Sequence, residues 1–167
     1  RVPYWLDGFI PLAYLLENEE MISVAKKYID AIVAAQEDDG WICPCKKEKR
    51  AIYDTWAVQL ICKTLKVYYE CSGDEEIPQV IYKILRNYYE LLESGKIRLF
   101  GWAKYRWFET FISLNFIYEK YNEFLSTGYT DKDDDINRLQ LYLKEKTPLY
   151  KRHIYIDRFD RFSKSEL

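Results

Sequence analysis

The feature that most constrains this chain is a repeating pair of apolar helical stripes, each pair divided by a short break. Apolar residues recur at helical spacing from Phe9, and a second stripe runs from Met21 to Val33 after an acidic break at residues 17–20. Because the break is short, the sequence predicts that these two helices form a hairpin.

The same pattern returns further along the chain. Helices are predicted over Ile52 to Glu70, over Ile77 to Leu92 and over Tyr105 to Tyr121, with one more short helix expected at Ile136 to Leu143. The tight breaks lie near residues 18, 73 and 122, and a period of roughly 50 residues is typical of stacked helical hairpins.

Single residues mark the predicted helix ends. Proline lacks a backbone N–H, so we expect Pro11 in the first turn of a helix or at a kink. Gly73 suits a helix C-terminus, and Asp74 suits the N-cap of the helix that follows.

Two kinds of connection alternate, one short and acidic, the other longer and carrying Gly-Trp at residues 40–41 and 101–102. This asymmetry favours a ring or an arc whose long loops lie on one side. We therefore predict an all-α fold of helical hairpins in an arc. Residues 1–145 would form the helical domain and residues 146–167 an irregular tail.

Aromatic residues are unusually frequent, at 17% of the chain, and 16 of them are tyrosines. Such a composition predicts thick aromatic packing or a groove lined by ring faces, which suits sugars and nucleobases. The net charge of −2 gives no overall field that would favour nucleic acid or an anionic membrane. Charged residues interrupt every apolar run before the ~20 residues that a membrane span needs.

The cysteines, at positions 43, 45, 62 and 71, do not resemble a small disulfide framework, so we expect a reducing cytoplasm. Cys43 and Cys45 form a CxC motif, and zinc would need about two further ligands. The single histidine, His153, lies far along the chain in a tail that alternates aromatic and basic residues. We interpret the motif as two loop thiols and the tail as an edge strand or irregular end, with no metal and no cofactor.

Three helix starts resemble one another: "YWLDG" from residue 4, "YDTW" from residue 53 and "YRWFE" from residue 105. Each places a tyrosine, a tryptophan and an acid at the mouth of a helix. In an arc of hairpins these starts face one rim, so we expect Asp7, Asp54 and Glu109 to lie among aromatic rings. The alternative is that Asp7 and Asp54 are acids that interact with the helix dipole at an N-terminus.

Together with "AAQEDDGWICP" from residue 34, these segments resemble the glycoside hydrolase family 127 domain, typified by β-L-arabinofuranosidases, over about residues 1–125. The resemblance implies an (α/α)6 barrel, of which this chain would supply about half. It also implies that the chain comes from a longer enzyme, and residue 1 is Arg rather than Met.

Within this resemblance, Trp5-Leu6-Asp7 matches a Trp-Leu-acid element, and Gln36 to Trp41 matches a Gln-x-Asp-Gly-aromatic loop. Residues 53–56 and 105–109 match elements that carry a histidine in better-known members, and this chain has no histidine there. Those members use a zinc-held cysteine thiolate and a glutamate from a later region, and no matching cluster is found in this sequence.

The candidate catalytic residues are therefore acids, because a glycosidase usually needs two carboxyl groups about 5–9 Å apart. We assign this role to Asp7, Asp54 and Glu109, for which binding sugar hydroxyls is the alternative role. All five tryptophans are candidate sugar platforms or else core residues, and Arg106 is a clamp for an acidic sugar or a structural ion-pair partner. The substrate-binding candidates are Trp5, Trp41, Trp56, Arg106 and Trp107.

Three hypotheses follow. The first is a carbohydrate-active glycoside hydrolase that resembles β-L-arabinofuranosidases. The alternative is a non-catalytic helical-repeat module that binds sugar or a protein partner on its concave side. A third hypothesis is that a second copy completes the half-ring, which would make the protein a homodimer.

Overall fold

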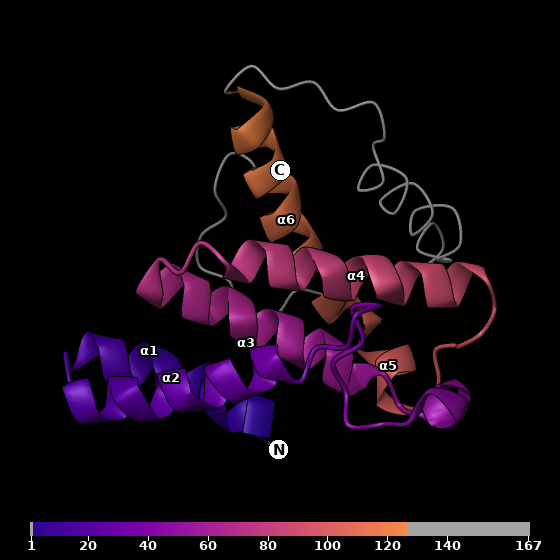
Figure 1. Cartoon of the computed structure of the whole chain (residues 1–167), viewed down its shortest axis with the longest axis horizontal. Coiled ribbons are helices and arrows are strands. Elements are labelled where there is room, and N and C mark those ends of the chain that lie inside the picture. Colours follow the sequence, from indigo (N-terminus) through magenta and orange to yellow (C-terminus); the bar gives the residue numbers. More distant parts are fainter. Residues whose placement is uncertain (1, 127–167) are drawn as a thin grey trace.

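The computed structural model describes residues 2–126, and within that range every regular element is a helix. This confirms the predicted all-α class. Figure 1 shows two successive hairpins, α1 with α2 and α3 with α4, followed by α6. The elements are α1 (Val2–Leu15), α2 (Glu19–Ala34), η1 (Lys47–Ile52), α3 (Trp56–Ser72), α4 (Ile77–Glu93), α5 (Gly101–Tyr105), η2 (Trp107–Glu109) and α6 (Thr110–Ser126).

The first hairpin turns at the predicted acidic break. The Asn18 side chain accepts a hydrogen bond from the Met21 backbone N–H at 3.0 Å, which satisfies one of the unpaired donors at the start of α2. Glu19 and Glu20 follow in the first turn of α2, where negative charge interacts favourably with the helix dipole. Local chemistry therefore accounts for this turn.

Helix α1 begins earlier than its apolar stripe predicts, at Val2 rather than near Phe9. Pro11 consequently lies well inside the helix, and the expectation that it occupies a first turn is wrong. Pro11 has no N–H to donate to the carbonyl four residues earlier, at Asp7. Tertiary packing compensates, because Leu6, Ile10 and Ala13 are fully buried along one side of α1.

The second hairpin turns at Gly73, as predicted. Gly73 has φ of +70°, which glycine adopts without a steric penalty, and its N–H donates to the Tyr69 carbonyl at 2.8 Å. The Asp74 side chain accepts a bond from the Glu76 backbone N–H at 3.1 Å, but the N-cap of α4 is Glu76, so the prediction of Asp74 as the N-cap is wrong by two residues. The predicted bounds of α4 are confirmed to within one residue at its C-terminus.

Two predicted helices start differently. The third helix begins at Trp56 instead of Ile52, because residues 47–52 form the separate 3-10 helix η1. The segment predicted as one helix from Tyr105 to Tyr121 is divided into α5, η2 and α6. Both breaks occur where aromatic and charged side chains from distant segments meet.

Helix α3 is the centre of the fold and packs against α1, α4, α5 and α6. Its buried apolar residues include Val58, Ile61, Cys62 and Leu65. Two hydrogen bonds link buried polar groups between the start of α3 and α4: the Tyr88 hydroxyl bonds with Thr55 Oγ1 at 3.1 Å and accepts from Gln59 Nε2 at 3.3 Å. Helix α3 therefore packs directly against both α1 and α6, the other two helices that carry or follow the similar starts.

None of the helices described over residues 2–126 is long and apolar enough to cross a membrane. The predicted helix at residues 136–143, the domain boundary at residue 145, the tail and His153 lie outside the described residues.

Candidate functional site

The three similar helix starts meet in space. Trp56 Nε1–H donates to Glu109 Oε2 at 2.9 Å, and the Arg106 guanidinium lies 5.4 Å from the centroid of the Trp56 ring. Arg106 Nη1 donates to the Tyr4 hydroxyl, and the Tyr4 ring meets the Trp56 ring edge-on at 5.4 Å. The Trp102 ring packs against the Trp56 ring at a tilt, with ring centroids 5.7 Å apart. We call Tyr4, Trp56, Trp102, Arg106 and Glu109 the rim cluster.

The rim cluster combines exposed rings with a partly covered charge pair. Trp102 is 60% exposed and Tyr4 is 47% exposed, whereas the Glu109 side chain is only 14% exposed. Arg106 Nε lies 3.5 Å from Glu109 Oε1, so the two charges offset each other. Flat apolar ring faces beside hydrogen-bonding charged groups suit a ligand with both apolar faces and hydroxyl groups.

Asp54 lies beside the rim cluster, where its carboxylate accepts hydrogen bonds from backbone N–H groups. Its Oδ2 accepts from the Trp102 N–H at 2.8 Å, and its Oδ1 accepts from the Ala103 N–H at 3.0 Å. Oδ1 also accepts from the Trp56 N–H at 3.1 Å. These bonds satisfy the first N–H groups of the short helix α5 and attach that helix to the start of α3.

Asp7 has a different partner. Its Oδ2 accepts from Lys63 Nζ at 2.7 Å, so this carboxylate links α1 to α3 in an ion pair that is partly exposed on both sides. The three candidate acids therefore do not share one set of contacts: Asp7 pairs with Lys63, Asp54 holds backbone N–H groups, and Glu109 belongs to the rim cluster.

The predicted tryptophans occupy three environments. Trp5 packs on α1 and α2 through Phe9 and Tyr28, and it is 45% exposed. Trp107 makes edge contacts with Phe108 and Phe111. Neither of these two tryptophans makes a ring contact with Trp56 in the described part of the chain. Of the five tryptophans, only Trp56 and Trp102 belong to the rim cluster.

Of the two predicted roles for Trp41, sugar platform or core residue, its burial favours the second, because the side chain is only 2% exposed. Its Nε1–H donates to the Cys43 carbonyl at 2.7 Å, and the Arg50 guanidinium covers the ring at 4.5 Å from its centroid. Because these contacts bury the ring, Trp41 is a core residue of the loop.

Tyr4 belongs to the rim cluster but was not among the candidate site residues. It precedes the predicted Trp-Leu-acid element and accepts a hydrogen bond from Arg106. The repeated tyrosine at the three helix starts was the available signal. Among residues 2–126 there is no group of three histidine, cysteine or acidic side chains that would hold a metal ion.

A family model described as "ADDB, N-terminal" matches residues 111–167, the C-terminal third of the chain. Within the described residues this match covers only α6, and it overlaps the segments that resemble glycoside hydrolase family 127 only there. No curated protein and no solved structure matches the chain.

Proposed function

We propose that this chain is the sugar-binding part of a carbohydrate-active protein of the glycoside hydrolase type. The observation that carries the proposal is the hydrogen bond from Trp56 to Glu109, together with the bond from Arg106 to Tyr4. These contacts join the three segments that carry most of the resemblance to glycoside hydrolase family 127, although the segments are roughly 50 residues apart in sequence.

The chemistry of the rim cluster fits a sugar ring. The exposed face of Trp102 provides a flat apolar platform, and apolar area that a ligand removes from water there contributes about 25 cal/mol per Å². Arg106 donates and Glu109 accepts hydrogen bonds, so the pair matches hydroxyl groups that both accept and donate. In this proposal Glu109 is the carboxylate that faces the substrate.

A non-catalytic sugar-binding module is the second candidate, and a specific observation favours it. Asp54 uses both carboxylate oxygens to hold backbone N–H groups, and Asp7 is paired with Lys63. Hydrolysis by two carboxyl groups would therefore need an acid beyond these two to act with Glu109.

The test is a binding and turnover screen on the full chain. Arabino-oligosaccharides and other short glycans are titrated by isothermal calorimetry, and a panel of aryl glycosides reports hydrolysis. Trp102→Ala is expected to weaken glycan binding about fivefold, which corresponds to the loss of about 1 kcal/mol of apolar burial. Leu15→Ala is the matched control, because Leu15 is 81% exposed at the C-terminal end of α1.

Binding that both variants retain equally would remove the rim cluster from the site. Glu109→Gln separates the two candidates, because it removes the negative charge and keeps the side-chain shape. Loss of turnover with binding retained supports a hydrolase, whereas binding without turnover in the unmodified chain supports the non-catalytic module. No binding of any glycan would overturn both.

A further inference from the structure

A pocket of the structure shares none of its lining residues with the rim cluster. This pocket, of about 770 Å³, opens between the start of α1, the second half of α2, the start of α3 and the loop at residues 42–46. Pockets that hold small molecules typically measure about 300–1,000 Å³, so this one is large enough for a compact ligand.

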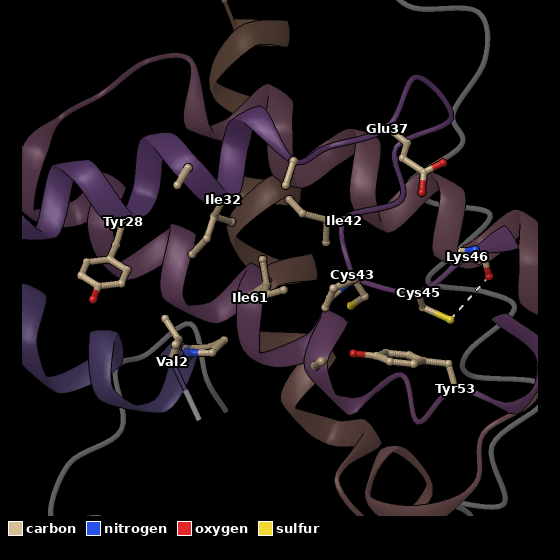
Figure 2. A pocket seen from close by; sticks show the side chains of 15 residues that line it. Val2, Tyr28, Ile32, Glu37, Ile42, Cys43, Cys45, Lys46, Tyr53 and Ile61 are labelled. Atoms are coloured by element: carbon tan, nitrogen blue, oxygen red, sulfur yellow. Dashed lines mark hydrogen bonds between the residues drawn. The ribbon is translucent and has the colours of Figure 1, made fainter. Parts of the chain in front are cut away.

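The walls of the pocket are mainly apolar. Figure 2 shows Ile32, Ile42 and Ile61 converging on its middle, from α2, the loop and α3. Tyr28 stands at one end and Tyr53 at the other, where Cys43 and Cys45 also line the wall. A ligand in this pocket would lie between isoleucine side chains, with a tyrosine at each end.

The polar end of the pocket is uncharged near neutral pH. Burial raises the pKa of the Cys43 thiol to about 12, although a hydrogen bond with Tyr53 acts against this. Burial, with the neighbouring Cys43, also raises the pKa of the Tyr53 hydroxyl to about 12. Both groups therefore stay protonated, and they offer hydrogen-bonding atoms without charge.

The charged residues of the pocket lie at its margin. Glu37 Oε2 is 3.0 Å from Arg50 Nη2, so its charge is compensated, and Lys46 is exposed to solvent. A charged ligand would lose hydration in the apolar middle without gaining a charged partner there. A neutral ligand avoids that cost.

We propose that this pocket binds a neutral aromatic molecule of one or two rings that carries a hydroxyl group. The rings would contact the isoleucines and lie edge-on or offset to a tyrosine, and the hydroxyl would donate to the Tyr53 oxygen. The proposal does not rest on the carbohydrate function, because none of the residues that line the pocket belongs to the rim cluster.

The first experiment titrates the full chain with 2-naphthol and follows the fluorescence of the probe. Binding is expected to saturate at one molecule per chain. Ala31→Trp should weaken it at least about tenfold, because Ala31 is an exposed position of α2 that lines the pocket, and an indole there fills part of it. Ala34→Trp is the matched control, since Ala34 is also exposed on α2 but does not line the pocket. Equal affinity in both variants, or binding that does not saturate, would overturn the proposal.

The second experiment tests the hydroxyl contact. Tyr53→Phe should weaken 2-naphthol binding about fivefold, which corresponds to one hydrogen bond, and should leave 2-methylnaphthalene binding unchanged. An equal loss for both probes would mean that Tyr53 only shapes the wall, and it would contradict the hydroxyl part of the proposal.

The third experiment needs no substitution. Cys45 lines the pocket and is partly exposed, whereas Cys71 is partly exposed on α3 outside it. Saturating 2-naphthol should slow the alkylation of Cys45 by iodoacetamide severalfold and leave that of Cys71 unchanged, as measured by peptide mass spectrometry. Unchanged alkylation of Cys45 in the presence of saturating 2-naphthol would place the probe elsewhere and overturn the proposal.

Discussion

Asp54 and Gly101 approach each other so closely that only glycine fits at residue 101. Gly101 has φ of +55°, and a Cβ atom added there would lie 2.5 Å from Asp54 Oδ2. The close approach lets the Asp54 carboxylate accept the N–H groups of Trp102 and Ala103. The position of Trp102 in the rim cluster therefore depends on Gly101, a residue that is not itself part of the cluster.

Gly101→Ala should lower the free energy of unfolding by about 1–3 kcal/mol, because the methyl group meets a carboxylate oxygen and the backbone has positive φ. Urea denaturation followed by circular dichroism measures the change. Gly8→Ala is the control: Gly8 lies in α1 with open space around its Cα, and alanine there should raise stability by about 0.5–1 kcal/mol. Equal destabilisation by both substitutions would contradict the argument.

The role of Asp54 shows how far residue-level sequence reasoning reaches. The sequence places this acid at a helix start, and it does precede α3. Its strongest contacts, however, are with backbone groups 48 and 49 residues away. No local pattern around Asp54 could reveal them, because they depend on how α5 docks against α3.

At the element scale, the loop between α2 and α3 is held by one buried cation. Arg50 is only 5% exposed, and its Nη1 donates to Asp39 Oδ2 at 2.7 Å while Nη2 lies 3.0 Å from Glu37. Its guanidinium also covers the Trp41 ring. Arg50 thus links several residues of this loop. The charged composition of residues 46–50 by itself would indicate only a segment exposed to solvent.

Asp39 supplies a prediction for this loop. Burial opposes ionisation of its carboxyl group, but the Arg50 hydrogen bond and charge outweigh that effect and hold its pKa below the usual value. The stability that this pair contributes is therefore complete above the unfolded pKa of about 4 and is lost as the pH falls through the lower folded value.

Asp39→Asn should lower the free energy of unfolding at pH 7 by about 1 kcal/mol, since the Asp39 side chain is 35% exposed and solvent screens the pair. The difference from the unsubstituted protein should shrink as the pH is lowered below about 4. Urea denaturation across pH 2–7 tests this, with Asp38→Asn in the same loop as the control. A difference that stays constant over that pH range would show that charge is not the cause.

At the scale of the whole molecule, α3 is the helix against which most of the other described elements pack. It packs against α1, α4, α5 and α6 and carries much of the buried apolar surface. Backbone amides of α3 should therefore exchange with solvent at least about tenfold more slowly than those of the five-residue helix α5. Hydrogen exchange measured by mass spectrometry tests this, and comparable rates in the two helices would contradict α3 as the centre of the fold.

The sequence by itself determined the all-α class, the approximate places of the main helices and where several of them turn. Apolar periodicity, the Asn18 cap and Gly73 act within a few residues, so their effects are visible in the local pattern. It also determined that the three similar helix starts carry aromatic and acidic residues.

Only the tertiary structure decided what each of those residues touches. Trp41 is covered by Arg50 while Trp102 is exposed, although each directly follows a glycine in the sequence. Asp54 holds backbone N–H groups while Glu109 bonds with Trp56, although both are acids at helix starts. The physical reason is that burial and hydrogen bonding at these positions depend on residues that lie 9 to 53 positions away in the sequence. Sequence periodicity carries no record of which faces the folded chain brings together.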